Sequence, residues 1–340
     1  MHKHHIGEKI KKRKHIHILL CLQIFLCIYG FDSITNLTEG ARPELLIETN
    51  EPRLYKMIKG ARDYIVNQQN EDGGWSLLPG GESEVETTAL AIWALIEADW
   101  GTGSRIIRRG VRYLRNSQRD DGSWNDNTAH TIFALIALTK ANTDPEARFD
   151  GLTWIKKAQN PSGSWGRKGN TFGHVLYTSA TLVGLKYIGF NYRSFDSLLP
   201  GMEWLDNLDH RNREGYWNLP GGTQSDIYVT AWALQGLSPV YNVDEQIAWL
   251  KQFQNINGGF PRFPRKESDP EVTATVIMAL AANEDPVNTR RIAINYLTKV
   301  QADDGSFISN TPREIRSPTA NLQTTCMVLI AVHSKTDRKQ

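Results

Sequence analysis

The sequence predicts an all-α protein in which six helical hairpins close into a ring, an α6/α6 barrel or α/α toroid. Three observations predict this fold: a short motif recurs along the chain, its copies lie one hairpin apart, and amphipathic segments alternate with apolar ones. A single hairpin of this kind cannot bury its apolar face alone, whereas stacked repeats share a continuous core. Six such pairs can close the stack on itself.

The recurring motif is a glutamine, three residues, a glycine, one residue and an aromatic residue. Five copies keep the pattern, and a sixth, at residues 211–217, has arginine in place of glutamine. We interpret the motif as structural, with the amide bonding backbone groups freed at a helix end and the ring packing over it. The glycine permits a tight exit from the helix. The copies end at Trp75, Trp124, Trp165, Trp217, Phe260 and Phe307.

Each motif copy separates an amphipathic segment from a more apolar one. The segments before the copies, such as residues 54–68, place apolar residues at helical spacing with charges on the opposite face. A helix that is apolar nearly all round is buried on most sides. We therefore expect the amphipathic helices outside and the apolar ones inside. The predicted inner helices are residues 87–98, 131–141, 178–188, 230–237, 273–282 and 324–332.

The N-terminal segment differs from the rest of the chain. Residues 1–14 contribute +5 to the net charge of +2, and residues 15–31 are apolar and uncharged, so residues 32–340 sum to −3. A basic stretch before an apolar run is typical of a signal peptide or signal-anchor. We predict such a segment at residues 1–31, a linker at 32–53, the toroid at 54–335 and a tail at 336–340. This predicts a secreted or membrane-anchored protein with its domain outside the cytoplasm. The mildly acidic domain argues against nucleic acid as a partner.

The Gln-xxx-Gly-x-Trp repeat resembles the prenyltransferase/squalene oxidase repeat of terpenoid cyclases and protein prenyltransferase β subunits. The resemblance covers about residues 54–335. It implies that a hydrophobic, isoprenoid-like molecule binds in the central cavity. A class II-like cyclase would protonate such a chain without metal or cofactor. The resemblance does not indicate an oligomeric state.

Class II terpene cyclases carry Asp-x-Asp-Asp-Thr-Ala at the start of an inner helix, and the central Asp is the acid. The closest match is residues 84–89, where Glu86 would be the general acid and Glu84 its flanking carboxylate. The second match, residues 269–274, places Glu271 and Asp269 in the same two positions. Both matches have Glu for the central Asp, and neither keeps the third acid.

The same acids have a purely structural interpretation. Ser83 with Glu86, and Ser268 with Glu271, have the spacing of helix capping boxes. Acids in a first helical turn are also stabilised by the helix dipole. A zinc-dependent prenyltransferase is not predicted, because Val229 replaces the histidine ligand in the segment that resembles its zinc-binding helix. We therefore predict no metal site.

Other inner-helix residues are candidates for contact with a ligand. A polar residue lies four positions before each inner-helix threonine or its equivalent, which predicts a polar ring at one mouth of the barrel. Aromatic rings inside the barrel can stabilise carbocations through their π faces. A non-catalytic extracytoplasmic barrel that binds a ligand or a partner protein remains the alternative. The candidate substrate-binding residues are Asp226, His174, Trp93, Phe133, Tyr177, Tyr228 and Trp232.

Overall fold

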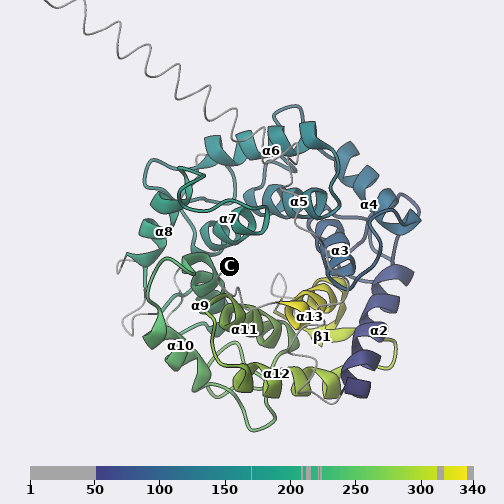
Figure 1. Cartoon of the computed structure of the whole chain (residues 1–340), viewed down its shortest axis with the longest axis vertical. Helices are drawn as coiled ribbons and strands as arrows, with labels where there is room; N and C mark the ends of the chain where they lie inside the picture. Colours follow the sequence, from purple (N-terminus) through teal and green to yellow (C-terminus); the bar gives the residue numbers. More distant parts are fainter. Residues whose placement is uncertain are drawn as a thin grey trace, which may run out of the picture.

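Two concentric rings of helices form the protein (Figure 1). The computed structural model describes residues 51–334 except 170, 208–209, 212–215, 221, 223 and 312–317. Within this part of the chain the outer ring consists of α2 (Glu51–Asn67), α4 (Arg105–Asn116), α6 (Pro145–Ala158), α8 (Leu198–Asp206), α10 (Asp244–Lys251) and α12 (Val287–Val300). The inner ring consists of α3 (Val85–Glu97), α5 (Thr128–Lys140), α7 (Val175–Tyr187), α9 (Ile227–Leu237), α11 (Pro270–Ala282) and α13 (Leu322–His333). The predicted α6/α6 toroid is confirmed.

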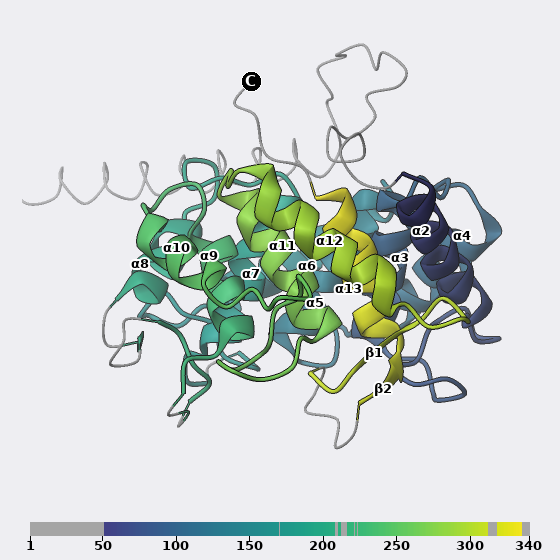
Figure 2. The ribbon, with the colours of Figure 1, turned by 90° about the horizontal axis from the view of Figure 1, so that it is seen from below.

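The inner helices run parallel to one another, because each follows an outer helix that runs the opposite way. Their N-terminal ends lie at the same face as a short antiparallel hairpin, β1 (Phe307–Ser309) and β2 (Thr319–Asn321), at the bottom of Figure 2. Their C-terminal ends lie at the opposite face. The barrel therefore has two chemically different mouths, one lined by helix N-termini and one by helix C-termini.

The predicted N-terminal signal segment, most of the linker and the tail lie outside the described residues. Helix α2 begins at Glu51, so it includes the last three residues of the segment predicted as linker. No helix in the described part of the chain is long and apolar enough to cross a membrane.

Each inner helix begins two or three residues before its predicted start. All six predicted ranges start at a threonine, but this threonine, or the one directly after it, lies inside the first turn, where it joins the helix to the preceding motif. In the first copy, the backbone N–H of Trp75 donates to Thr88 Oγ1 at 2.9 Å. The same bond links the motif aromatic residue to Thr131, Thr178, Thr273 and Thr325 in four other copies.

The five motif glutamines link five of the six outer helices to the next one. Gln301 Nε2 donates to the Gly305 carbonyl at 2.9 Å and to the Met57 carbonyl at 2.9 Å, which links the last motif to α2 and closes the ring. The motif indole groups hydrogen-bond to the helix that precedes them in the chain. Trp75 Nε1, for example, donates to the Ile65 carbonyl of α2. The four other glutamines make the same two bonds, and their partners in the next repeat are Ile106, Ala147, Ser197 and Thr289.

The motif glycine is required for two reasons. Gly305 has a φ of +91°, which L side chains rarely adopt, and a Cβ built there would lie 2.2 Å from the Gly60 carbonyl oxygen. The glycine thus lets the motif turn approach the backbone of the next outer helix. Gly73, Gly122, Gly163 and Gly258 have the same positive φ and the same close backbone neighbour in their own repeats.

We predict that Gly305→Ala destabilises the barrel much more than Gly80→Ala. Gly80 also has a positive φ, +74°, but a Cβ there would meet nothing within 4 Å. The left-handed conformation should cost about 1–2 kcal/mol in both variants. The clash with Gly60 should add about 1–3 kcal/mol in Gly305→Ala alone. Urea denaturation of the two variants measures the difference, and equal losses of stability would contradict the packing role.

Candidate functional site

A ring of polar residues lies at the mouth formed by the inner-helix N-termini. Each of them is the N-cap of its helix, so the predicted ring exists and its members sit one residue before the helix starts. Most of them accept hydrogen bonds from backbone N–H groups of the first turn, which satisfies donors that the helix leaves open. The ring consists of Glu84, Asn127, His174, Asp226, Asp269 and Asn321.

The predicted capping boxes are wrong by one residue. Glu84 and Asp269, rather than Ser83 and Ser268, occupy the N-cap positions. The serine hydroxyls instead donate to side chains of their own motif turns, Ser83 Oγ to Asp72 at 2.7 Å and Ser268 Oγ to Asn257 at 2.8 Å. The serines therefore brace the motif turn, which sequence spacing alone does not distinguish from a helix cap.

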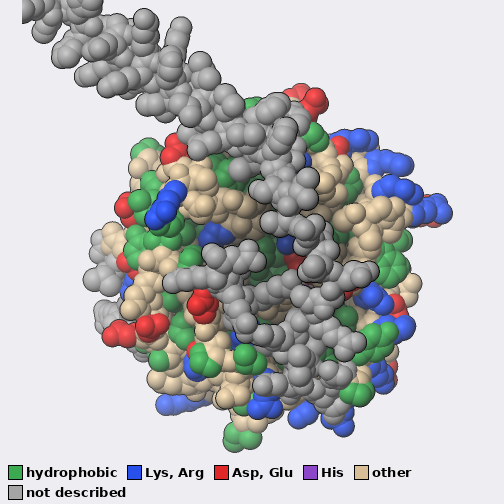
Figure 3. Space-filling model, viewed as in Figure 1, with side chains coloured by type: hydrophobic (Ala, Val, Ile, Leu, Met, Phe, Trp, Pro, Cys, Tyr) green, Lys and Arg blue, Asp and Glu red, His purple; other side chains and the backbone are tan. Residues whose placement is uncertain are grey.

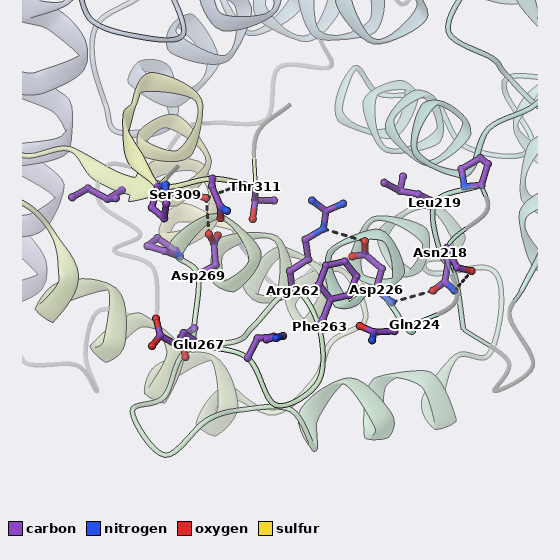
Figure 4. Close-up of a pocket in the computed structure, with 18 residues that line it drawn as sticks. Asn218, Leu219, Gln224, Asp226, Arg262, Phe263, Glu267, Asp269, Ser309 and Thr311 are labelled. Carbon is purple, nitrogen blue, oxygen red and sulfur yellow. Dashed lines mark hydrogen bonds and ion pairs between the residues drawn. The ribbon is translucent and has the colours of Figure 1, made fainter. Parts of the chain in front are cut away.

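A polar pocket of about 1260 Å³ lies at this mouth. Figure 4 shows Asp269 with Ser309 on one side of the pocket and Asp226 with Arg262 on the other. Ser309 Oγ donates to Asp269 at 2.7 Å, and Arg262 Nε donates to Asp226 at 3.1 Å. Burial raises the pKa of both carboxyl groups, although these hydrogen bonds oppose the rise.

Glu271, the second residue of α11, is the most deeply buried acid of the candidate set. Its side chain is fully buried, and both of its oxygens accept hydrogen bonds from α13. Thr324 Oγ1 donates to Oε2 at 2.6 Å, and Gln323 Nε2 donates to Oε1 at 2.9 Å. The pKa of Glu271 is raised to about 8, chiefly by burial and to a smaller extent by the nearby charges of Asp269 and Glu86, while the two hydrogen bonds oppose the rise. Glu271 therefore carries a proton at neutral pH.

Gln323 can pair with either form of this acid. Its Oε1 atom is buried and has no hydrogen-bond partner among the described residues, while its Nε2 faces the carboxyl group. Rotation of the amide would present Oε1 to the same carboxyl oxygen and accept its proton. Gln323 was not found from the sequence, because it lies about fifty residues from Glu271 in an unremarkable part of α13.

The first acidic match is less enclosed than the second. The Glu86 side chain is 17% exposed, and its Oε2 lies 3.5 Å from His130 Nε2. Glu84 is the N-cap of α3, and its backbone N–H donates to the Trp75 carbonyl at 2.8 Å. The sequence ranked residues 84–89 above 269–274, whereas burial favours Glu271 as the residue that holds a proton.

Five of the predicted substrate-binding residues surround one cavity, here named the near chamber. It has a volume of about 300 Å³ and is lined by Phe133, His174, Tyr177, Tyr228 and Trp232 with smaller apolar residues. Tyr228 connects this chamber to the acid, because its hydroxyl lies 3.4 Å from Glu271 Oε1. Burial lowers the pKa of His174, so its imidazole is neutral near pH 7.

The other two predicted substrate-binding residues lie elsewhere. Asp226 lines the polar pocket at the mouth rather than the near chamber. Trp93 is buried in the wall, where its indole N–H donates to Glu97 at 3.1 Å and its ring meets Tyr187 edge-on, with centroids 4.7 Å apart. Trp93 therefore packs between inner helices and does not line either of the cavities inside the barrel.

A second cavity inside the barrel, here named the far chamber, opens at the opposite mouth. It has a volume of about 350 Å³ and is lined by Glu97, Lys140, Gln235, Met278 and others near the C-terminal ends of the inner helices. Lys186 also lines it and donates to the Ser238 carbonyl at 2.7 Å and the Gly236 carbonyl at 3.1 Å. Figure 3 shows this face of the molecule, hollowed near its centre where no grey atoms cover it. This cavity was not predicted from the sequence.

Within the described residues, no group of three or more His, Cys, Asp or Glu side chains could hold a metal ion. Val229, which replaces the histidine ligand of the prenyltransferase pattern, is fully buried in the first turn of α9.

Comparison with known families agrees with this architecture. The profile of the prenyltransferase alpha-alpha toroid domain matches residues 128–308 and 230–336, which together make up more than half of the chain. The profile of the squalene-hopene cyclase C-terminal domain matches residues 43–133. The chain belongs to the prenyltransferase alpha-alpha toroid domain family.

Individual relatives are distant. A probable squalene–hopene cyclase of Sinorhizobium fredii is 24% identical over 276 residues, which cover 62% of this chain and 41% of the relative. A drimenyl diphosphate synthase of Streptantibioticus cattleyicolor is 22% identical over 288 residues, 80% of this chain and 46% of the relative. The chain thus spans less than half the length of both relatives.

Among solved structures, a type II terpene cyclase from Scytonema, in complex with geranylgeranyl dihydroxybenzoate, superimposes with a TM-score of 0.61. The sequence identity is 16%, and the match covers 83% of this chain and 97% of the cyclase chain. At this identity the likeness establishes the fold, and the chemistry has to be argued from the site.

We predict that the stability of the protein depends on pH through Glu271. The folded state binds this proton more tightly than the unfolded chain, whose glutamate titrates near 4.5. The stabilisation from Glu271 is therefore complete below about pH 4.5 and is lost as the pH rises towards about 8. Glu271→Gln should gain stability relative to the native protein by about 1.4 kcal/mol per pH unit across this range.

Urea denaturation of both proteins between pH 5 and about 8 measures this difference. Glu245→Gln, at an exposed carboxylate on α10, is the matched control and should follow the native profile. Parallel profiles for Glu271→Gln and the native protein would contradict a raised pKa at Glu271.

Proposed function

We propose that the barrel is a class II-like terpenoid cyclase in which Glu271 supplies the proton for an isoprenoid alkene through Tyr228, whose hydroxyl gives its own proton to the alkene and takes that of Glu271. The observation that carries this proposal is a fully buried carboxyl group with a pKa of about 8, joined through Tyr228 to an aromatic chamber. A general acid must hold its proton at working pH, and burial gives Glu271 that property. Glu271 replaces Glu86 as the preferred acid.

The near chamber supplies what the reaction needs after protonation. Addition of a proton to an alkene leaves a carbocation, which aromatic faces attract and water would quench. The aromatic residues Phe133, Tyr177 and Trp232 line the chamber. The neutral imidazole of His174, which also lines the chamber, is a candidate base for the proton lost when the cation collapses to an alkene.

The family comparisons support the same chemistry. The two relatives are named for cyclised or drimenyl isoprenoid products, and the solved terpene cyclase was captured with a geranylgeranyl compound as substrate. The substrate and product of the present chain are part of the proposal, because the chain covers less than half of either relative.

A ligand-binding barrel without turnover is the second candidate function. It is favoured by the acidic pattern itself, because Thr87 and Val272 stand where class II cyclases have a third acid. Such a barrel would bind the same hydrophobic molecules in the near chamber and release them unchanged.

We predict that the purified protein converts a linear isoprenoid to a cyclised product and that Glu271→Gln lowers the rate by about 10²–10⁴-fold. The rate should fall as the pH rises through about 8, because Glu271 then loses its proton. Mass spectrometry of extracts from incubations with linear isoprenoid alcohols and diphosphates measures both effects.

Two variants serve as comparisons in this experiment. Glu86→Gln should keep more activity than Glu271→Gln, and Glu245→Gln on the outer ring should match the native protein. Full activity in Glu271→Gln would exclude it as the acid, while retention of a ligand without any product would favour the binding function.

A further inference from the structure

The near and far chambers have no lining residue in common, although α5, α7 and α9 contribute to both. On α5, Phe133 lines the near chamber and Lys140 the far one. On α9, Trp232 lines the near chamber and Gln235 the far one. With a rise of about 1.5 Å per residue, Trp232 lies about 6 Å along the axis of α9 from Tyr228 and about 4.5 Å from Gln235. The division between the chambers therefore falls at the level of Trp232.

An aromatic pair occupies this level. Phe133 and Trp232 meet edge-to-face across the barrel, with ring centroids 6.3 Å apart and an interplanar angle of 65°. Their exposed fractions are 6% and 4%, so little of either ring is left open. On the side that faces Glu271, the ring of Tyr228 packs edge-on against the ring of Trp232, with ring centroids 6.4 Å apart. The pair therefore lies at the level that separates the lining residues of the near chamber from those of the far chamber.

We propose that the Phe133–Trp232 pair forms the floor of the near chamber and limits the substrate to short isoprenoids. The chamber volume of about 300 Å³ corresponds to about ten water-sized groups, which suits a chain of about ten to fifteen carbon atoms. A chain as long as squalene would have to pass the pair to reach the far chamber. This proposal rests on the proposed function only in taking the near chamber as the isoprenoid site.

Equilibrium binding tests the floor without requiring turnover. The full-length protein is dialysed against detergent micelles that contain geraniol, farnesol, geranylgeraniol or squalene, and the bound fraction is measured. The native protein should bind geraniol or farnesol at least about tenfold more tightly than squalene, a difference of about 1.4 kcal/mol. Equal binding of squalene and farnesol, or binding of none of the four, would overturn the proposal.

Variants of the floor give the decisive comparison. The double variant Phe133→Leu with Trp232→Leu should join the two chambers and raise squalene binding at least about tenfold. Trp249→Leu, which truncates a tryptophan on the outer helix α10, is the matched control and should keep the native preference. A folded double variant that still rejects squalene would show that the pair is not the floor.

A second variant works in the opposite direction and does not weaken the floor. Ala180 on α7 lines the near chamber, so Ala180→Leu should reduce its volume and shift the preference from farnesol to geraniol. An unchanged preference in this variant would also overturn the proposal. Binding of short isoprenoids with the predicted variant effects, but without product, would leave the floor intact and reject the cyclase function. Turnover of squalene would support the cyclase function and reject the floor.

Discussion

The barrel depends on the contact between each motif turn and the backbone of the next outer helix. A glutamine amide bridges two carbonyls, and a glycine lets the chains approach to a distance that a Cβ would forbid. Because the contact recurs in five of the six repeats, it aligns the starts of the inner helices. Their N-caps then converge on one mouth, and their C-termini converge on the other. The site is a consequence of this alignment, since it brings acids from different repeats together.

The repeated helical hairpins could be predicted from the sequence. Copies of the motif fixed the number of hairpins, and the apolar segments identified the inner ring, because both features depend only on local composition and spacing. The starts of the inner helices were less accessible. Two of these helices were predicted to start at Thr87 and Thr273, which lie inside the first turn, and Ser83 and Ser268 belong to the motif turns. A capping box and a serine-braced turn have the same spacing, and only the backbone geometry separates them.

The ranking of the acids could not be read from the sequence. Residues 84–89 resemble the cyclase pattern more closely than residues 269–274. Glu271, in the second match, is nevertheless more deeply buried than Glu86, and it accepts two hydrogen bonds from α13. Glu271 is enclosed because Gln323 and Thr324 of α13 cover it, and this contact spans about fifty residues of chain. Desolvation depends on every neighbour that excludes water, so a short motif carries little information about it.

The proposed role of Glu271 as a proton donor depends on a difference between the two sides of the barrel mouth. The second residues of α3, α9, α11 and α13 are polar, whereas those of α5 and α7 are Ala129 and Leu176. Glu271 lies on the polar arc, the near chamber extends over the apolar arc, and Tyr228 contacts both. Burial alone would keep Glu271 protonated, but it would also make the charged carboxylate too costly to form. Donors from Gln323 and Thr324 stabilise that carboxylate, so they strengthen the acid at the moment when the proton leaves. Gln323 and Thr324 therefore limit the rise in the pKa of Glu271 that burial causes.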